Sequence, residues 1–197
     1  MDFAQQLVNG LALGSVYALI AIGYTMVYGI IKLINFAHGD IYMVGAFFGY
    51  LVALYLKLSF VPSLLISMLG CAVLGVLIEK VAYKPLRGSS KITLFITAIG
   101  MSLLLENAFR LIFGPNPKPF PELLKVKIYK LGGFQINSLQ ISMLLVSIIL
   151  VILLQYIVYR TKSGKAMRAA SFDIDAAQLM GINVNNTISM TFAIGSA

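Results

Sequence analysis

Charged residues are scarce in this chain of 197 residues, and their scarcity excludes an ordinary soluble domain. Asp, Glu, Lys and Arg make up 11% of the sequence, whereas soluble domains carry about 25%. Hydrophobic residues make up 59%, and the mean hydropathy is +0.91. The net charge of +8 comes from basic residues that lie between apolar runs, where they indicate membrane orientation rather than nucleic-acid binding.

Residues that could support catalysis or bind a metal are also few. The single cysteine, Cys71, excludes an internal disulfide and lies in an apolar run, where a buried, unreactive thiol is expected. The single histidine, His38, has no second ligand at metal-binding spacing, so we expect no metal and no cofactor. The chain lacks a Gly-x-x-x-x-Gly-Lys-Ser/Thr phosphate loop for ATP. It also lacks a nucleophile–base pair, which argues against an intramembrane enzyme.

Long apolar runs are what the sequence has in place of charge. Five of them match the roughly 20 residues that a helix needs to cross a bilayer, and a helix satisfies its own backbone hydrogen bonds in lipid. A sixth run starts near Asn186 and reaches Ala197, which is too short to span. We therefore expect an all-α, polytopic bundle with a truncated sixth span, and residues 1–197 to form a single transmembrane domain that is an N-terminal fragment. The predicted spans are 5–31, 36–56, 60–79, 92–113 and 138–159.

The lysines and arginines predict how these spans are oriented. Loops 79–91 and 160–185 each hold four basic residues, and they share a side because two spans separate them. Cytoplasmic loops are usually the basic ones, so both loops should face the cytoplasm. The N-terminus and the loop 114–137 should then lie outside.

The outer loop 114–137 has a structure of its own. Prolines alternate with other residues from Pro115 to Pro121, which favours an extended segment. Alternating residues at 125–128 and 134–137 flank Gly132 and Gly133, and this pattern predicts a small β-hairpin. Either the hairpin contacts an external partner or it caps two helices.

The polar connection between the first two spans is a candidate site. The apolar run 41–56 is short, so the second helix should open near Asn35, which is a good N-cap. A capped helix start accounts for the polar residues without a ligand. An interrupted helix inside a membrane is also typical of transporters, whose helix N-termini face anionic groups of the substrate. In that interpretation Asn35, His38 and Gly39 line the translocation path.

Glu106 and Arg110 lie inside the fourth predicted span, four residues apart on one helix face, as an ion pair requires. We expect a structural pair rather than a proton relay, because relays use several carboxylates and Glu106 is the one carboxylate counted in the predicted spans. The same scarcity argues against the alternative of an ion-coupled secondary transporter or channel.

The segment 161–181 is the most specific part of the sequence. Ser171 or Asp173 can cap a short helix, and Gly181 can end it. Small residues on such a helix let a partner protein approach closely. The alternative is an amphipathic helix lying on lipid, but the segment has few large apolar residues.

Two motifs resemble those of one transporter family. The string Asp175-Ala-Ala-x-x-x-Gly181 looks like the EAA motif of ABC-importer permeases, with Asp in place of Glu. The longer pattern that begins at Gly164 is similar to the form found in high-affinity branched-chain amino-acid permeases, and so is the string Asn35-Phe-Ala-His-Gly39. The resemblance extends from the N-terminus to Ala197.

This resemblance implies the permease subunit of an ABC importer in the bacterial cytoplasmic (inner) membrane, which is not itself an enzyme. The implied substrates are hydrophobic, branched-chain amino acids, with urea or short amides as the alternative. The implied partners are a second permease subunit, two cytoplasmic ATPase subunits and an extracytoplasmic substrate-binding protein. Residues 160–185 would form the coupling loop to the ATPases. The implied coupling residues are Gly164, Arg168, Asp173, Asp175, Ala176, Ala177 and Gly181.

Overall fold

Helices dominate the computed structural model of the chain, which describes residues 3–32, 34–131 and 134–197. Five helical stretches among these residues are long and apolar enough to cross a membrane. They confirm the predicted all-α, polytopic helix bundle, and most of their ends lie within a few residues of the predicted ones. The five stretches are Phe3–Ile31, His38–Leu56, Phe60–Leu86, Lys91–Phe113 and Ser138–Arg160.

Each stretch is one helix, or a helix continued by short turns of another helical type. The second stretch ends in a π-helical turn, after which Lys57 has a positive φ of 49°. The third stretch continues through π-helical and 3-10 turns to Leu86, beyond the predicted end at residue 79. The elements in chain order are α1 (Phe3–Ile31), α2 (His38–Leu51), η1 (Val52–Leu56), α3 (Phe60–Ile78), η2 (Glu79–Tyr83), η3 (Lys84–Leu86), α4 (Lys91–Phe113), β1 (Ile128–Leu131), β2 (Phe134–Asn137), α5 (Ser138–Arg160), α6 (Lys162–Phe172), α7 (Ile174–Leu179) and α8 (Val184–Ser196).

Side-chain caps set where the later helices begin. Asn137 accepts a hydrogen bond from the Gln140 N–H at 2.7 Å, and the Gln140 side chain accepts the Asn137 N–H at 3.0 Å, which makes a capping box for α5. Asn183 accepts the Asn186 N–H at 3.1 Å. α8, which corresponds to the sixth predicted run, therefore begins at Val184, slightly before the predicted start near Asn186.

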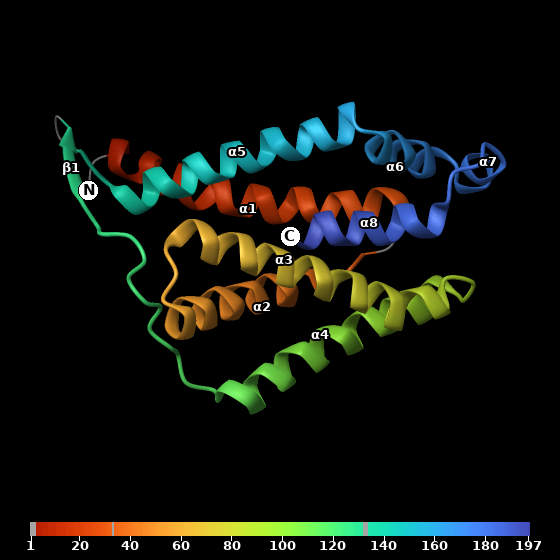
Figure 1. Cartoon of the computed structure of the whole chain (residues 1–197), viewed down its shortest axis with the longest axis horizontal. Coiled ribbons are helices and arrows are strands. Elements are labelled where there is room, and N and C mark those ends of the chain that lie inside the picture. The colour runs from red at the N-terminus through yellow and green to blue at the C-terminus, as the bar shows by residue number, and fades with distance from the viewer. Residues whose placement is uncertain (1–2, 33, 132–133) are drawn as a thin grey trace.

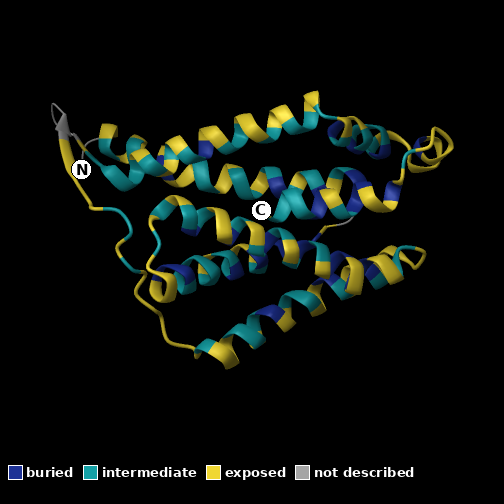
Figure 2. Ribbon diagram, viewed as in Figure 1, coloured by how far each residue is buried: buried dark blue, intermediate teal, exposed yellow. Residues whose placement is uncertain are grey.

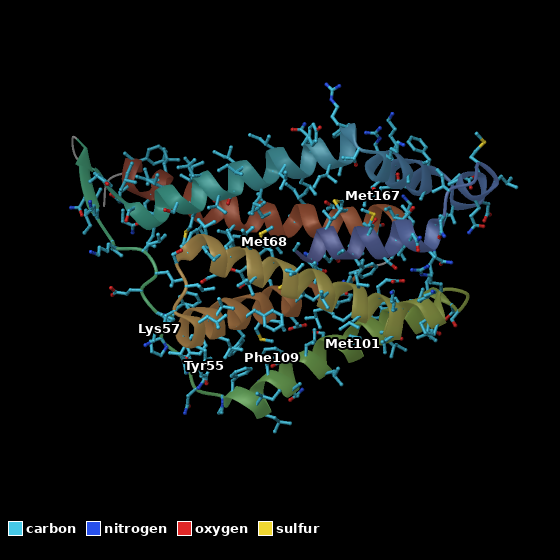
Figure 3. The ribbon with its side chains drawn as sticks, viewed as in Figure 1. Tyr55, Lys57, Met68, Met101, Phe109 and Met167 are labelled. Atoms are coloured by element: carbon cyan, nitrogen blue, oxygen red, sulfur yellow. The ribbon has the colours of Figure 1, made fainter. Side chains whose placement is uncertain are left out.

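The helices lie side by side, with α1 and α3 in the middle of the bundle (Figure 1). α5 packs on α1, α2 packs on α3, and α8 packs on both α1 and α3. α4 lies at the margin against α2, with Met101 and Phe109 between the two helices (Figure 3). Phe109 and Phe113 of α4 contact the ring of Phe47 on α2, with centroids 5.2 and 4.7 Å apart.

Burial is uneven along the bundle. Buried residues concentrate toward the end that carries α6 and α7, whereas the outward faces of the spans are exposed (Figure 2). In α5 the one buried residue is Ser147, and its exposed face carries large apolar side chains such as Ile148 and Leu153. An apolar outer surface suits contact with lipid, which has no hydrogen-bond partners to offer.

A two-stranded antiparallel sheet lies at the opposite end of the bundle from α7 (Figure 1). It confirms the predicted hairpin, but the first strand is β1 at 128–131 rather than 125–128. Leu131 pairs with Phe134. Because only two residues connect the strands, the residues that pair with β2 are 128–131. The turn predicted at Gly132 and Gly133 lies outside the described residues. Gln5 of α1 ties the helix to the sheet through two hydrogen bonds with the Gln135 backbone, at 2.9 and 2.7 Å.

Candidate functional site

Two short helices, α6 and α7, lie at one end of the bundle: α6 follows α5 and packs beside the ends of α1 and α8, and α7 lies beyond them (Figure 1). Asp173 separates them and caps α7, because its Oδ1 accepts the N–H groups of Asp175 and Ala176 at 2.9 and 3.0 Å. Gly181 follows α7 with a φ of +81°, a conformation that favours glycine. The predicted short helix is confirmed with Asp173 as its cap. Ser171 lies inside α6 instead.

The start of the motif holds α6 against the end of α5. A side chain at Gly164 would overlap the backbone carbonyl oxygens of Ile157 and Val158. Arg168 donates a hydrogen bond to the Val158 carbonyl at 3.0 Å, and its guanidinium lies 5.1 Å from the centre of the Tyr159 ring. Gly164 therefore allows α6 to approach the end of α5 closely, and the Arg168 side chain holds the two helices together.

The three residues of the EAA-like string differ in exposure. Asp175 and Ala176 are exposed, whereas Ala177 is 4% exposed and packs in the hydrophobic core. The Ala177 carbonyl also accepts the Ile182 N–H at 3.0 Å, which closes the turn after α7. A small side chain at 177 thus lets α7 lie close to the bundle, and a partner would contact the residues around it.

Large apolar side chains are exposed at both ends of α7. Phe172, Leu179 and Met180 are 95, 89 and 82% exposed. Sequence reasoning missed them, because it noted only that the segment has few large apolar residues. Their arrangement around a helix end could not be seen before α7 was located. Large apolar side chains exposed outside the membrane-spanning helices are typical of a protein-interaction surface.

The chain breaks between α1 and α2, as predicted, but only part of the connection faces the inside of the bundle: Asn35 and His38 are buried, whereas Phe36 and Gly39 are exposed. α1 ends near Lys32, which has a φ of 56°, and Asn35 is 3% exposed. The predicted helix start at Asn35 is wrong. α2 begins at His38 without a side-chain cap, because the Asn35 Oδ1 instead accepts the Tyr83 hydroxyl at 2.7 Å. This bond ties the connection to the end of the third span.

His38 is the first residue of α2 and is 7% exposed. Its Nε2 lies 3.2 Å from the Ile20 carbonyl of α1, and its ring meets the edge of Tyr24 with centroids 5.9 Å apart. A Cβ at Gly23 would lie 2.5 Å from the Gly195 carbonyl oxygen and 3.2 Å from the His38 ring, so the glycine allows both to approach α1 closely. Gly39 has no such neighbour within 4 Å.

A cavity of about 610 Å³ lies between α1, α2, α3 and α5, and His38 borders it. Met68, on the side of α3 that faces α1, is part of its wall (Figure 3). Its few polar side chains include the Ser63 and Ser67 hydroxyls, and most of the wall is apolar. Asn35 and Gly39 do not line it. Residues from the outer loop and from α8 also border the cavity, namely Phe120, Leu123 and 193–197.

A buried acid that sequence reasoning missed lies at the same end of the bundle as α7. Glu79 is fully buried, forms an ion pair with Arg87, and accepts a hydrogen bond from the Ser189 hydroxyl at 2.6 Å. The sequence pattern places Glu79 at the boundary between the predicted span 60–79 and the loop 79–91, whereas helical turns continue through it to Leu86. An acid directly after an apolar run, with a basic residue two turns later, was the signal available.

The predicted Glu106–Arg110 pair is formed, with 2.8 Å between the two groups and both side chains about half exposed. The expectation of a single carboxylate in the spans is wrong. Asp40 of α2 accepts the Ser102 hydroxyl of α4 at 2.5 Å, and Glu79 belongs to the third helical stretch. Among the described residues, no group of three His, Cys, Asp or Glu side chains could hold a metal ion.

The basic loops 79–91 and 160–185 meet in space, as the prediction of a shared side requires. Arg87 of the first donates a hydrogen bond to the Asn185 side chain of the second at 2.7 Å. The hairpin lies at the other end of the bundle (Figure 1).

A family model and several known proteins match this chain, and all are described as branched-chain amino acid permeases. Residues 6–197 match the model of a family described as the permease component of branched-chain amino acid transport systems. The chain is 41% identical to the high-affinity branched-chain amino acid transport system permease protein BraD of Pseudomonas aeruginosa. It is 38% identical to the corresponding protein LivH of Salmonella typhimurium and of Escherichia coli. Each alignment covers 99% of this chain and 67% of the relative. No solved structure matches the chain.

The Asn35–Tyr83 bond gives a first testable prediction. Asn35→Leu and Tyr83→Phe should each lower the thermal stability of the detergent-solubilised protein, because each removes one partner of a buried hydrogen bond. The double variant should be less destabilised than the sum of the two single variants, by about 0.5–3 kcal/mol, as for residues in contact. Additive losses would show that the two side chains are not bonded.

Proposed function

The chain belongs to the family of permease components of branched-chain amino acid ABC transport systems, and we propose that it forms one half of the inward pathway for hydrophobic amino acids. ATP is hydrolysed by partner subunits, since ATPases and a binding protein belong to such an importer. The proposed assembly contains this chain, a second permease subunit, two ATPase subunits and an extracytoplasmic binding protein. Residues 1–197 belong to a single permease domain.

The observation that carries the proposal is the apolar rim of α7, formed by Phe172, Leu179 and Met180. We assign this rim to contact with an ATPase subunit. The lipid alternative is less suitable, because a surface helix on lipid carries basic residues on its polar face, whereas α7 carries Asp175 and is capped by Asp173. A helix in this position lets ATPase movements reach the bundle.

The motif residues then divide into two roles. Gly164 and Arg168 orient α6 on α5, and Asp173 and Gly181 begin and end α7. The remaining residues belong to the docking face or support it: Asp175 and Ala176 are exposed beside the rim, and Ala177 seats α7 on the bundle.

The same assignment orients the bundle. The coupling loop 160–185 faces the cytoplasm, the N-terminus lies outside, and the loop 114–137 with its hairpin lies outside. Support comes from the basic residues of loops 79–91 and 160–185, since cytoplasmic loops are usually basic. The two loops contact each other at Arg87 and Asn185.

The translocation path is proposed to run past the α1–α2 break. His38 borders the cavity between α1, α2, α3 and α5; Gly39 follows His38 directly in the chain, and Asn35 lies three residues before it. The mostly apolar wall suits the side chains of branched-chain amino acids better than urea or short amides, which are small and polar. An ion-coupled transporter or channel has no need of a protruding apolar helix such as α7.

The docking role of α7 is tested by making its rim polar. The double variant Leu179→Gln and Met180→Gln should weaken the binding of ATPase subunits to the permease about tenfold or more, because each lost apolar anchor at an interface costs about 1 kcal/mol or more. Both side chains are exposed, so the permease should fold normally. The measurement is the amount of ATPase subunit that co-purifies with the permease in titration, with Lys165→Gln on α6 as the matched exposed control.

The docking role would be contradicted if the Leu179/Met180 double variant bound the ATPase subunit as well as the control and the wild type do. Loss of binding in the Lys165→Gln control as well would indicate that exposed changes anywhere on α6 and α7 disturb binding, and would not support a specific contact at the rim.

The outer loop is proposed to receive the binding protein. Lys118, Lys125 and Lys127 are exposed, and Lys130 follows them in β1. Basic residues at this position would steer an acidic surface, and such steering weakens with salt.

Replacement of these four lysines by glutamine should reduce uptake when the binding protein is limiting, and the defect should shrink at high salt. The measurement is uptake into vesicles against binding-protein concentration at two ionic strengths. If uptake by the variant depends on binding-protein concentration as it does in the wild type, at both ionic strengths, the four lysines are ordinary solvated surface charges.

A further inference from the structure

Glu79 has contacts that no role proposed so far uses. It is fully buried in the π-helical turn η2, where the Lys84 N–H bonds back to the Glu79 carbonyl. Its carboxylate has two partners: Arg87, which follows η3, and Ser189 of α8, whose hydroxyl donates at 2.6 Å. The carboxylate thus joins the end of the third span to α8.

The link from α7 to α8 is short and closed by hydrogen bonds. The Gly181 N–H donates to the Gln178 carbonyl at 2.9 Å, and the Ile182 N–H donates to the Ala177 carbonyl at 3.0 Å. Asn183 then caps α8. With so few free residues between them, α7 and α8 should move as one unit.

α8 holds the end of the third span at three points. Besides the Ser189–Glu79 bond, the Asn185 side chain accepts a hydrogen bond from Arg87 at 2.7 Å. About one turn after Ser189, the ring of Phe192 lies against the ring of Tyr83, with centroids 5.5 Å apart. Hydrogen bonds are directional, including those between an arginine and a carboxylate, so they fix the register between two helices that apolar contacts alone would allow to slide.

The end of the third span is bonded in turn to the α1–α2 break. Tyr83 lies in η2 four residues after Glu79, and its hydroxyl donates to Asn35 at 2.7 Å. The described contacts therefore form a continuous series from α7 through α8 and η2 to the residues before His38. Apart from backbone continuity, each step is a hydrogen bond, an ion pair or a ring contact.

We propose that Glu79 is a positioning residue for energy coupling, which locks the α7–α8 unit to the end of the third span through Arg87 and Ser189. Displacement of α7 by an ATPase then moves η2 and, through Tyr83 and Asn35, the α1–α2 break beside the cavity. This inference rests on the proposed function, because it needs an ATPase bound at α7. It goes further in naming the side chains that carry the movement.

A buried ion pair is suited to this role because its net contribution to stability is small. Replacing both members of such a pair by apolar residues of similar size is often neutral or stabilising, whereas removing one member leaves an unpaired buried charge and is strongly destabilising. Folding and coupling can therefore be separated by experiment: a double apolar replacement should keep the fold and lose the directional lock.

The test uses the complete importer, with its partner subunits, reconstituted in proteoliposomes. Two rates are measured together, uptake of a branched-chain amino acid and ATP hydrolysis stimulated by the binding protein. In Glu79→Gln, which keeps the size of the side chain and loses its charge, the number of molecules transported per ATP should fall several-fold, because ATP hydrolysis continues while the movement of α7 no longer reaches η2. The matched control is Glu106→Gln, which removes the acid of the half-exposed pair on α4 and should leave the ratio unchanged.

A second variant, Glu79→Met with Arg87→Met, separates coupling from folding. It should assemble with the ATPases at normal yield and show the same loss of transport per ATP. A normal ratio in either variant would overturn the proposal, because the charges would then serve folding alone. Wild-type importer that shows no ATP-dependent uptake would instead contradict the proposed function itself.

A measurement on the unmodified importer covers the case in which neither variant assembles. Hydrogen–deuterium exchange is compared with and without a non-hydrolysable ATP analogue. The amides of α8 and η2 should change protection together, with α4 as the internal reference. A change in α8 that leaves η2 as it was would overturn the proposal.

Discussion

The absence of water inside a bilayer is the constraint on which the rest of this structure depends. A polar group there needs a partner within the protein. Some buried hydroxyls, such as those of Ser67 and Thr191, bond to a carbonyl one turn earlier in their own helix, and two other polar pairs join different segments. Asn35 bonds with Tyr83, and Asp40 bonds with Ser102. Each pair joins segments that are distant in the sequence, so the few polar groups of the chain also decide which segments are held together.

The two ends of the bundle differ in a way that fits a permease. At the end that carries α6 and α7, buried residues are dense and the connections are closed by caps and hydrogen bonds. A largely apolar cavity extends between α1, α2, α3 and α5, from Phe120 and Leu123 of the outer loop to His38 at the start of α2. A packed end that receives a movement, joined to helices that border a cavity, suits transmission across a membrane.

Much of the fold could be predicted from the sequence, because long apolar runs have one structural solution in lipid. The spans, the hairpin and the short helix before Gly181 followed from hydrophobicity and from cap and turn residues. The contacts between distant segments could not be predicted. Asn35 is a good N-cap by residue type, yet its side chain bonds with Tyr83. Glu79 was placed where the third span ends, because basic residues follow it, whereas helical turns continue to Leu86. The motif was located correctly, but its exposed rim depended on how α7 sits on the bundle.

The central claim is that α7 lies on the cytoplasmic face and contacts an ATPase subunit. It is tested most directly by a single cysteine at the rim, Leu179→Cys, with Cys71→Ser to remove the other thiol. A membrane-impermeant thiol reagent should label this cysteine in inverted vesicles stripped of ATPase subunits and not in right-side-out vesicles. In the assembled importer, a bifunctional reagent should crosslink it to an ATPase subunit. Labelling from the outside, or an assembled and active importer without any crosslink to an ATPase, would contradict the account.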